Sequence, residues 1–131
     1  MSDRGVKSAG AMVQGAKSRI QNLDPDQVAK ELESGEALLV DVRDAPEREE
    51  HGAIPGALHI PRGMLEFRAD AGTPYHNSEL RPDRRIILAC ASGGRSALAT
   101  DLLQEMGYKN VANLAGGFKA WQESGLPVDK V

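Results

Sequence analysis

The residue with the clearest chemical potential in this sequence is its single cysteine, Cys90. An apolar run of strand length, residues 86–89, leads directly into it, and a loop of small and polar residues follows. Beyond the loop, apolar side chains recur at helical spacing until Gly107. The sequence therefore places the end of a strand, a short loop and the start of a helix around one thiol. The loop residues are Ala91, Ser92, Gly93, Gly94, Arg95 and Ser96.

This position favours Cys90 as a nucleophile. The start of a helix offers unpaired backbone N–H groups and the positive end of the helix dipole, and small residues let several amides point inward. Such a loop binds anions, so the pKa of Cys90 should be lowered, with help from Arg95 and without a histidine base. The alternative is an inert cysteine buried at a strand end. An inert thiol has no use for a polar, glycine-containing loop, so we favour the nucleophile.

The elements that must position this thiol alternate along the chain. The pattern predicts strands at 37–42, 57–60, 86–89 and around Val111, and helices that start near Pro25, Pro61 and Gly117 and after the cysteine loop. We therefore expect an α/β fold, a parallel sheet of about five strands with helices on both faces. In such sheets ligands bind beyond the carboxyl ends of the strands, where Cys90 is placed.

Two polar stretches between these elements are expected to be surface loops. One is the charged segment from Asp44 to Glu50, and the other is the segment that ends at Arg85. In the second loop, Arg81, Arg84 and Arg85 are expected to be solvated.

Composition limits the functions that the chain can have. Its 131 residues, 40% hydrophobic and 27% charged, are typical of one globular domain. The net charge of -3 disfavours nucleic acid as a partner, and a single cysteine excludes an internal disulfide, a CxxC redox pair and a cysteine-rich zinc site. No stretch approaches the ~20 apolar residues of a membrane span. We therefore expect a cytoplasmic protein without a membrane partner.

The first 22 residues differ from the rest of the chain. Ala9, Val13, Ala16 and Ile20 recur at near-helical spacing among basic residues, which predicts a surface-docked or frayed helix. A mitochondrial presequence would also be basic, but arginines are few in this segment. We expect residues 1–22 to be an N-terminal extension and residues 23–131 to form the catalytic domain.

Four motifs, taken together and in this order, resemble those of single-domain rhodanese-like sulfurtransferases. They are the strand end Asp41-Val42-Arg43, the turn Ile54-Pro55-Gly56-Ala57, the cysteine loop, and the late segment Gly116-Gly117-Phe118-Lys119-Ala120-Trp121. The resemblance covers about residues 23–129. Two departures lie before the turn: the family often has a histidine where this chain has Ala53, and an aromatic residue where it has Arg48 and Glu49.

The resemblance implies a persulfide mechanism on a rhodanese-like fold. Cys90 would attack the sulfane sulfur of thiosulfate, sulfite would leave, and a thiophilic acceptor such as cyanide or a thiol would take the sulfur. Backbone amides from Ala91 through Ser96 would bind the anions, and no metal or organic cofactor is implied. A second reading is a delivery module that takes sulfur from a donor protein and passes it to a protein partner such as a sulfur carrier.

Cysteine phosphatases of the cell-cycle type and arsenate reductases have similar loops on related folds, with five residues between cysteine and arginine. Here four residues, Ala91 to Gly94, separate Cys90 from Arg95, and Ser96 stands where a phosphatase needs arginine. By the same resemblance, the shorter loop fits sulfur better than a phosphoryl group. Both activities therefore rank below sulfur transfer.

Three further residues are candidates for supporting the site. Asp41 and Arg43 look like structural partners that tie neighbouring loops together. Arg62 follows the third strand and is placed to steer anions, although a solvated arginine fits the sequence equally well. The histidines at positions 51, 59 and 76 lack the spacing of metal ligands, so no metal site is predicted.

Overall fold

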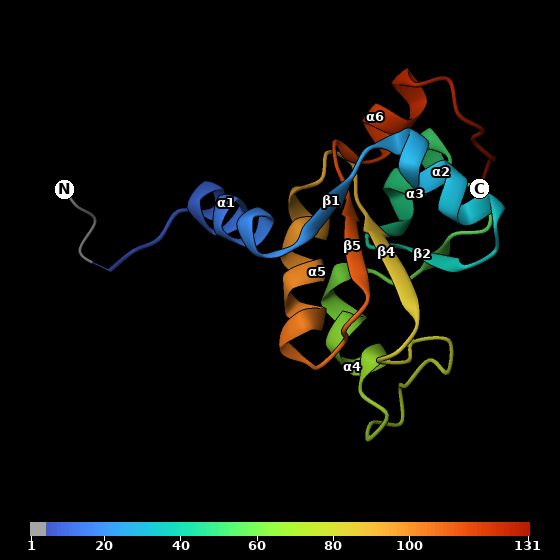
Figure 1. The fold of residues 1–131 in the computed structure, drawn as a ribbon. Coiled ribbons are helices and arrows are strands. Elements are labelled where there is room, and N and C mark those ends of the chain that lie inside the picture. The colour runs from blue at the N-terminus through green and yellow to red at the C-terminus, as the bar shows by residue number, and fades with distance from the viewer. Residues whose placement is uncertain (1–4) are drawn as a thin grey trace.

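The computed structural model describes residues 5–131, which contain a parallel five-stranded sheet of strand order β1-β5-β4-β2-β3 (Figure 1). The strands are β1 (Gln21–Leu23), β2 (Ala37–Asp41), β3 (Leu58–His59), β4 (Arg85–Ala89) and β5 (Val111–Leu114). Strand β4 lies in the middle, paired with β2 on one side and β5 on the other. The predicted α/β fold with a parallel sheet is confirmed, and Cys90 follows its central strand.

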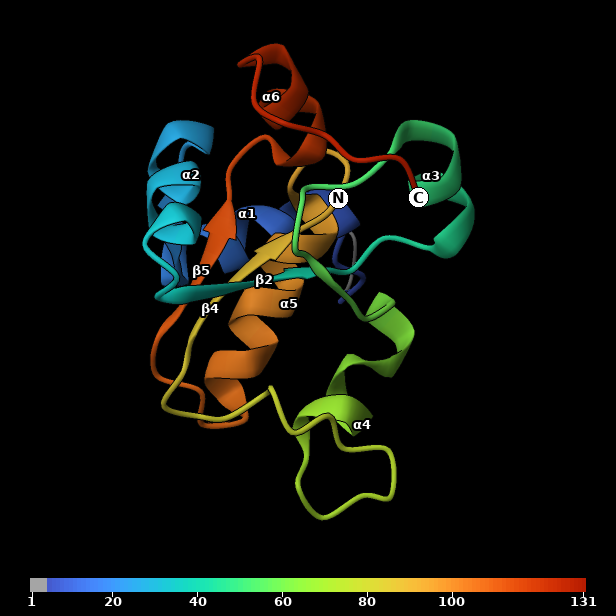
Figure 2. The same cartoon turned by 90° about the vertical axis from the view of Figure 1, so that its right-hand side faces the viewer.

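Helices cover both faces of this sheet (Figures 1 and 2). Helices α4 (Leu65–Ala69) and α5 (Gly94–Glu105) pack on one face, and α2 (Pro25–Glu33) and α6 (Gly117–Glu123) pack on the other. Because side chains alternate along a strand, β4 contributes Ile86 and Leu88 to the first core and Ile87 and Ala89 to the second. Cys90 continues the first set, so its side chain lies on the side of α5.

The segment from Asp44 to Glu50, expected to be a loop, instead forms most of helix α3 (Ala45–His51). The Asp44 amide donates to the Glu47 carboxylate at 2.9 Å, and Pro46 lies in the first turn. The expectation failed because a helix on the surface can carry charge on most of its positions, so apolar periodicity gives no signal for it.

Arg85 was expected to be solvated, and this was wrong. Its Nε and Nη2 donate to the two carboxylate oxygens of Glu31 on α2, at 2.8 and 3.0 Å. Only 15% of the Arg85 side chain is exposed, whereas Arg81 is exposed as expected. The ion pair fixes the start of β4 against α2. After β3, the 3-10 turn η1 (Arg62–Met64) leads into α4, as predicted for this stretch, and residues 70–84 then form the expected long loop before β4.

The part of the chain before the sheet contains helix α1 (Ala9–Arg19), which packs against α5. Ala16 is fully buried, the Arg19 guanidinium binds the Asp101 carboxylate at 2.7 Å, and the Gln104 side-chain amide donates to the Arg19 carbonyl. The chain then enters β1, which pairs with β5 at one edge of the sheet. Among residues 5–131, no helix has both the length and the apolar character needed to cross a membrane.

Candidate active site

The cysteine loop connects the carboxyl end of β4 with the start of α5. Gly93 adopts a φ of 101°, in the left-handed region that favours glycine, and this turn directs the first residues of α5 back toward the thiol. A side chain at this position would also lie 3.2 Å from the backbone nitrogen of Gly116. Cys90 itself is 1% exposed. The loop therefore encloses the sulfur almost completely.

Three hydrogen-bond donors converge on the Cys90 Sγ atom. The Gly93 amide lies 3.1 Å away, and the amide and hydroxyl of Ser96 each lie 3.4 Å away. Because the amides in the first turn of a helix have no acceptor within that helix, those of Gly94 and Arg95 are available to a ligand, while that of Ser96 donates to Sγ. The arrangement is an anion-binding nest built around a sulfur atom.

These donors determine the ionisation of the thiol. Burial raises the pKa of Cys90, but the hydrogen bonds from the Ser96 hydroxyl and from the amides of Ser96, Gly93 and Ser92 together outweigh burial. The pKa of Cys90 is therefore lower than that of an ordinary thiol. The loop favours the thiolate, which is the nucleophilic form.

The carbonyl groups of the same loop point toward α6, which binds them. The Phe118 amide donates to the Cys90 carbonyl at 2.8 Å, and the Lys119 amide donates to the Ala91 carbonyl at 3.0 Å. Gly117, with a φ of 64°, packs so closely that a Cβ atom there would lie 2.6 Å from the Cys90 carbonyl oxygen. The late Gly-Gly motif thus fixes the loop backbone with its carbonyls turned away from the sulfur.

The Arg95 guanidinium is bound to Glu47 on α3 by two hydrogen bonds of 2.8 Å. This bidentate pair joins the start of α5 to α3 and carries a positive charge beside the thiolate. The Arg95 hydrogen bond lowers the pKa of Glu47 to about 2, and the same hydrogen bond raises the pKa of Arg95. Arg95 therefore acts on Cys90 through its charge and through the position of α3.

The lowered pKa of Glu47 predicts a loss of stability in acid. Because this pKa falls from 4.5 to about 2 on folding, the pair stabilises the protein fully above pH 4.5 and less as the pH falls toward 2. Both side chains are about a third exposed, so solvent screening limits the effect to about 1 kcal/mol. Urea unfolding at neutral pH and at about pH 3 should show wild type losing about 0.5 kcal/mol more than Glu47→Gln, since pH 3 lies part of the way down to the folded-state pKa of about 2.

The control is Glu66→Gln, which removes the same charge from a similarly exposed pair with Arg62 that has one hydrogen bond of 3.0 Å instead of two of 2.8 Å. Its acid sensitivity should match that of wild type. Equal acid sensitivity of Glu47→Gln and wild type would contradict the assigned role of the Arg95 pair.

Asp41 and Arg43 form a buried ion pair beside the loop. Asp41 pairs in register with Ala89, its carboxylate binds the amide and guanidinium of Arg43, and Arg48 adds a contact at 3.2 Å. Arg43 also donates to the Gly52 carbonyl at 2.8 Å and lies 4.3 Å from the centre of the Phe118 ring. Arg43 therefore links β2, the end of α3 and α6, the elements that surround the cysteine loop.

Two other residues singled out in the sequence have local partners. Arg62 binds Glu66 one helical turn later, at 3.0 Å, so its charge is partly neutralised. The His59 ring nitrogen lies 2.6 Å from the Arg43 carbonyl, which gives this histidine a packing role beside the buried pair.

The sequence reasoning missed Asn113 on β5. This side chain is fully buried, and its Oδ1 accepts a hydrogen bond of 2.6 Å from the Ser96 hydroxyl. The available signal was the residue type itself: an asparagine within the apolar strand Val111-Ala112-Asn113-Leu114 needs a buried partner.

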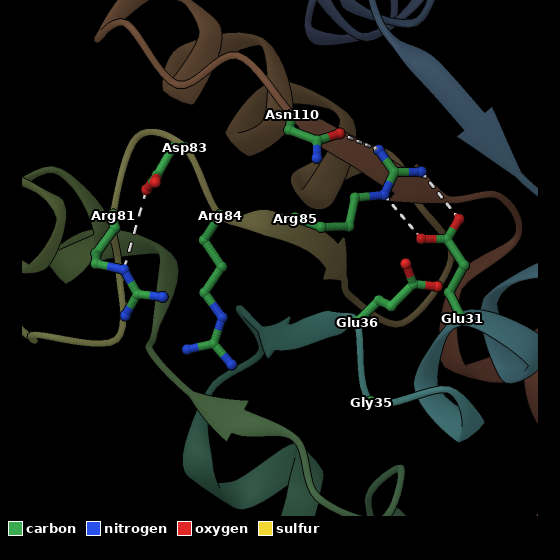
Figure 3. A pocket seen from close by; sticks show the side chains of 8 residues that line it. All are labelled: Glu31, Gly35, Glu36, Arg81, Asp83, Arg84, Arg85 and Asn110. Atoms are coloured by element: carbon green, nitrogen blue, oxygen red, sulfur yellow. Dashed lines mark hydrogen bonds and ion pairs between the residues drawn. The ribbon is translucent and has the colours of Figure 1, made fainter.

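A hollow of about 750 Å³ lies at the N-terminal end of β4, at the end of the strand away from Cys90 (Figure 3). Its arginines contact acidic side chains: Arg85 binds Glu31, Arg81 lies 4.0 Å from Asp83, and Arg84 lies 3.5 Å from Glu79. The positive charges are balanced, so the hollow resembles a solvated charged surface rather than an anion site.

Comparisons with known proteins agree on one family. The family described as Rhodanese-like domain matches residues 24–124. A sulfurtransferase of Allochromatium vinosum is 34% identical, over 83% of this chain and 94% of its own length. Human thiosulfate:glutathione sulfurtransferase is 35% identical, over 70% of this chain and 84% of its own length. A solved Rhodopseudomonas palustris structure of unknown function, described as a possible tyrosine phosphatase, is 38% identical with a TM-score of 0.91, covering 98% of this chain and 99% of that one.

Proposed function

Because the chain belongs to the rhodanese-like domain family, we propose that Cys90 is the covalent sulfur carrier of a sulfurtransferase. The donor would be thiosulfate or another source of sulfane sulfur, and the acceptor cyanide or a thiol. The observation that supports this most directly is the convergence of the Gly93 and Ser96 backbone amides on Sγ. These donors stabilise the thiolate form of Cys90.

Two displacements at sulfur complete the reaction. The Cys90 thiolate attacks the outer sulfur of thiosulfate, the S–S bond of thiosulfate breaks, and sulfite leaves with the electron pair. The resulting Cys90 persulfide carries its negative charge on the outer sulfur. Cyanide then attacks that sulfur, the Sγ–S bond breaks, and thiocyanate leaves as the thiolate is restored. Neither step moves a proton, which suits a site whose donors are fixed backbone amides.

The loop residues from Ala91 to Ser96 would share the binding of these anions. Their amides would hold the negative charge of thiosulfate and of the persulfide, and the Arg95 charge would stabilise both. The buried pair of Asp41 and Arg43 would keep the loop in place, and Arg62 would steer anions toward the site.

The wider context is also a proposal. We assign the catalytic unit to residues 23–131 and treat residues 1–22 as an extension of it, which over its described residues 5–22 supplies α1 and the first two residues of β1. A carrier cysteine must stay reduced between turnovers, so a reducing compartment such as the cytoplasm suits this reaction.

The Rhodopseudomonas palustris structure makes phosphate ester hydrolysis the competing proposal. A phosphoryl group needs donors arranged around a tetrahedral ion beyond Sγ, and an arginine free to bind two of its oxygens. In this chain the donors converge on Sγ itself, and Arg95 is already bound to Glu47. Sulfur transfer therefore fits the loop better.

The test is the intact mass of the purified protein before and after incubation with thiosulfate, and again after cyanide. We expect a gain of about 32 Da, one sulfur atom, which cyanide removes as thiocyanate. Cys90→Ser, which preserves the size of the side chain, should gain nothing. Hydrolysis of an aryl phosphate is measured on the same samples. No mass gain together with Cys90-dependent phosphate release would reject sulfur transfer in favour of a phosphatase.

A third outcome distinguishes an enzyme that uses thiosulfate from a delivery module. If Cys90 gains sulfur only from a persulfide-carrying donor protein, sulfur transfer stands and thiosulfate is rejected as the donor. The acceptor would then be sought among proteins rather than small anions.

A further inference from the structure

Hydrogen bonds connect the cysteine loop to the segment before the family match. The Ser96 hydroxyl lies 2.6 Å from Asn113 Oδ1, and Asn113 Nδ2 lies 3.2 Å from Asn22 Oδ1. Asn22 Nδ2 in turn donates to the carbonyl of Lys17 in the last turn of α1, at 3.1 Å. Asn22 lies on β1, before residue 24 where the family match begins. The N-terminal segment therefore reaches the Cys90 site through two asparagines.

The donors and acceptors in this series of hydrogen bonds are fixed at the end farthest from Cys90, at Asn22. Asn22 Nδ2 faces the carbonyl oxygens of Lys17 and Ile20, which only accept hydrogen bonds. Asn22 therefore turns its Oδ1 toward Asn113, and the Asn113 Nδ2 group donates a hydrogen bond to it. The same Nδ2 group also lies 3.5 Å from the Gly93 carbonyl oxygen. This leaves Asn113 Oδ1 toward Ser96. Since a carbonyl oxygen cannot donate, the Ser96 hydroxyl donates its proton to Asn113.

The Ser96 hydroxyl thus has one proton and two acceptors. Asn113 Oδ1 lies at 2.6 Å, whereas Cys90 Sγ lies at 3.4 Å. The shorter contact holds the proton, so the hydroxyl donates to the sulfur at less than full strength. The backbone amides of Gly93 and Ser96 remain fully directed at Sγ, because no side chain competes for them.

We propose that Asn22 and Asn113 are positioning residues that hold the Ser96 proton away from the Cys90 thiolate and thereby keep it strongly nucleophilic. The proposal rests on the role of Cys90 as the sulfur-carrying nucleophile. A thiolate loses nucleophilicity as its basicity falls, so a full-strength hydrogen bond from the Ser96 hydroxyl would slow its attack. The persulfide carries its charge on the outer sulfur rather than on Sγ. Withholding the Ser96 hydrogen bond from Sγ therefore reduces the stabilisation of the persulfide less than that of the thiolate.

Charged groups on several elements surround the cysteine loop, and the variants below leave all of them in place. Helix α3 contributes Glu47, bound to Arg95 of α5, with Asp44 at its N-terminus. The end of β2 contributes the cluster of Asp41 and Arg43, which Arg48 joins from α3. Lys119, an exposed residue on α6, reaches the loop through its backbone amide.

The test is the pH dependence of Cys90 alkylation by iodoacetamide in the full-length protein, which has no other cysteine. Asn22→Ala removes the closer of the two acceptors of Asn113 Nδ2 and leaves only the 3.5 Å contact with the Gly93 carbonyl, so that Asn113 can reverse its amide and donate to Ser96, and the hydroxyl proton becomes free for Sγ. We expect the midpoint of the profile to fall by about one pH unit, and the rate at high pH to fall about threefold. Asn113→Ala should act in the same direction, because it removes the competing acceptor.

Two comparisons separate this effect from a structural one. In a Ser96→Ala background, Asn22→Ala should no longer move the profile. Asp101→Ala, which removes the ion pair between α1 and α5 but none of the asparagine contacts, should leave the wild-type profile unchanged. An unmoved profile in Asn22→Ala and Asn113→Ala, a shift that persists without the Ser96 hydroxyl, or an equal shift in Asp101→Ala would each overturn the proposal. Alkylation needs no sulfur donor, so this result is independent of whether the protein transfers sulfur.

Discussion

The substitution Gly117→Ala is expected to lower the rate of sulfur transfer about 100-fold and to destabilise the fold by about 2 to 4 kcal/mol. The added Cβ would lie 2.6 Å from the Cys90 carbonyl oxygen and 2.7 Å from the carbonyl carbon and oxygen of Ala91. All three are backbone atoms, so the cysteine loop or α6 must move. Either movement lengthens the bonds from the Phe118 and Lys119 amides that hold the loop. A displacement of the nucleophile by about 1 Å is enough to lower the rate about 100-fold.

Gly125→Ala is the matched control for this prediction. Gly125 has a similar positive φ of 74° and follows the other end of the same helix, but a Cβ there meets no atom within 4 Å. It carries the backbone strain without the clash, so the destabilisation should be near 1 kcal/mol and the transfer rate should stay at the wild-type level. The measurements are thiocyanate production and thermal unfolding. If both variants transfer sulfur equally well, α6 does not position the loop.

The site could be read from the sequence to the extent that it is contiguous. Cys90 and the six residues after it form one strand-loop-helix unit, so local rules of helix starts and glycine turns already place their amides near the sulfur. The partner of Arg95 was not predictable in this way, because Glu47 lies 48 positions away on another helix. The contacts of Asn113 and Asn22 were not predicted for the same reason. Their contacts depend on β5 lying between β4 and β1, which is a property of the sheet order.

The fold shows the same limit. The strands β2 and β4 are buried on both faces and appear as apolar runs, so their positions were predicted closely. Strand β1 was not located in advance, since it has three residues, two of them exposed, and gives too little pattern to recognise. Helix α3 was taken as a loop because four of its seven residues are charged and only Ala45 and Pro46 are apolar, so it shows no apolar periodicity. Elements at the edge of the structure thus depend on tertiary pairing more than on their own residues.

The buried pair beside the loop leads to a second large expected effect. The substitution Asp41→Asn should reduce the free energy of unfolding by about 3 to 5 kcal/mol, because it leaves the Arg43 guanidinium buried without a counter-charge. Arg43 is 2% exposed and makes its closest ionic contact with Asp41, at 2.8 Å. Asparagine has nearly the same shape, so the loss measures the charge and its hydrogen bonds rather than packing. Arg48 would lose the same partner.

The matched control is Asp101→Asn, which makes the same chemical change in an exposed pair. The Arg19 side chain is 58% exposed, and such surface pairs contribute less than about 1 kcal/mol. Urea unfolding should therefore show a much lower midpoint for Asp41→Asn, with little change in slope, and a nearly unchanged midpoint for Asp101→Asn. If the two variants were equally mild, water would have to reach Arg43 in solution. The cation-π contact with Phe118 and the bond to the Gly52 carbonyl would then suffice to hold α6 and the end of α3 around the cysteine loop.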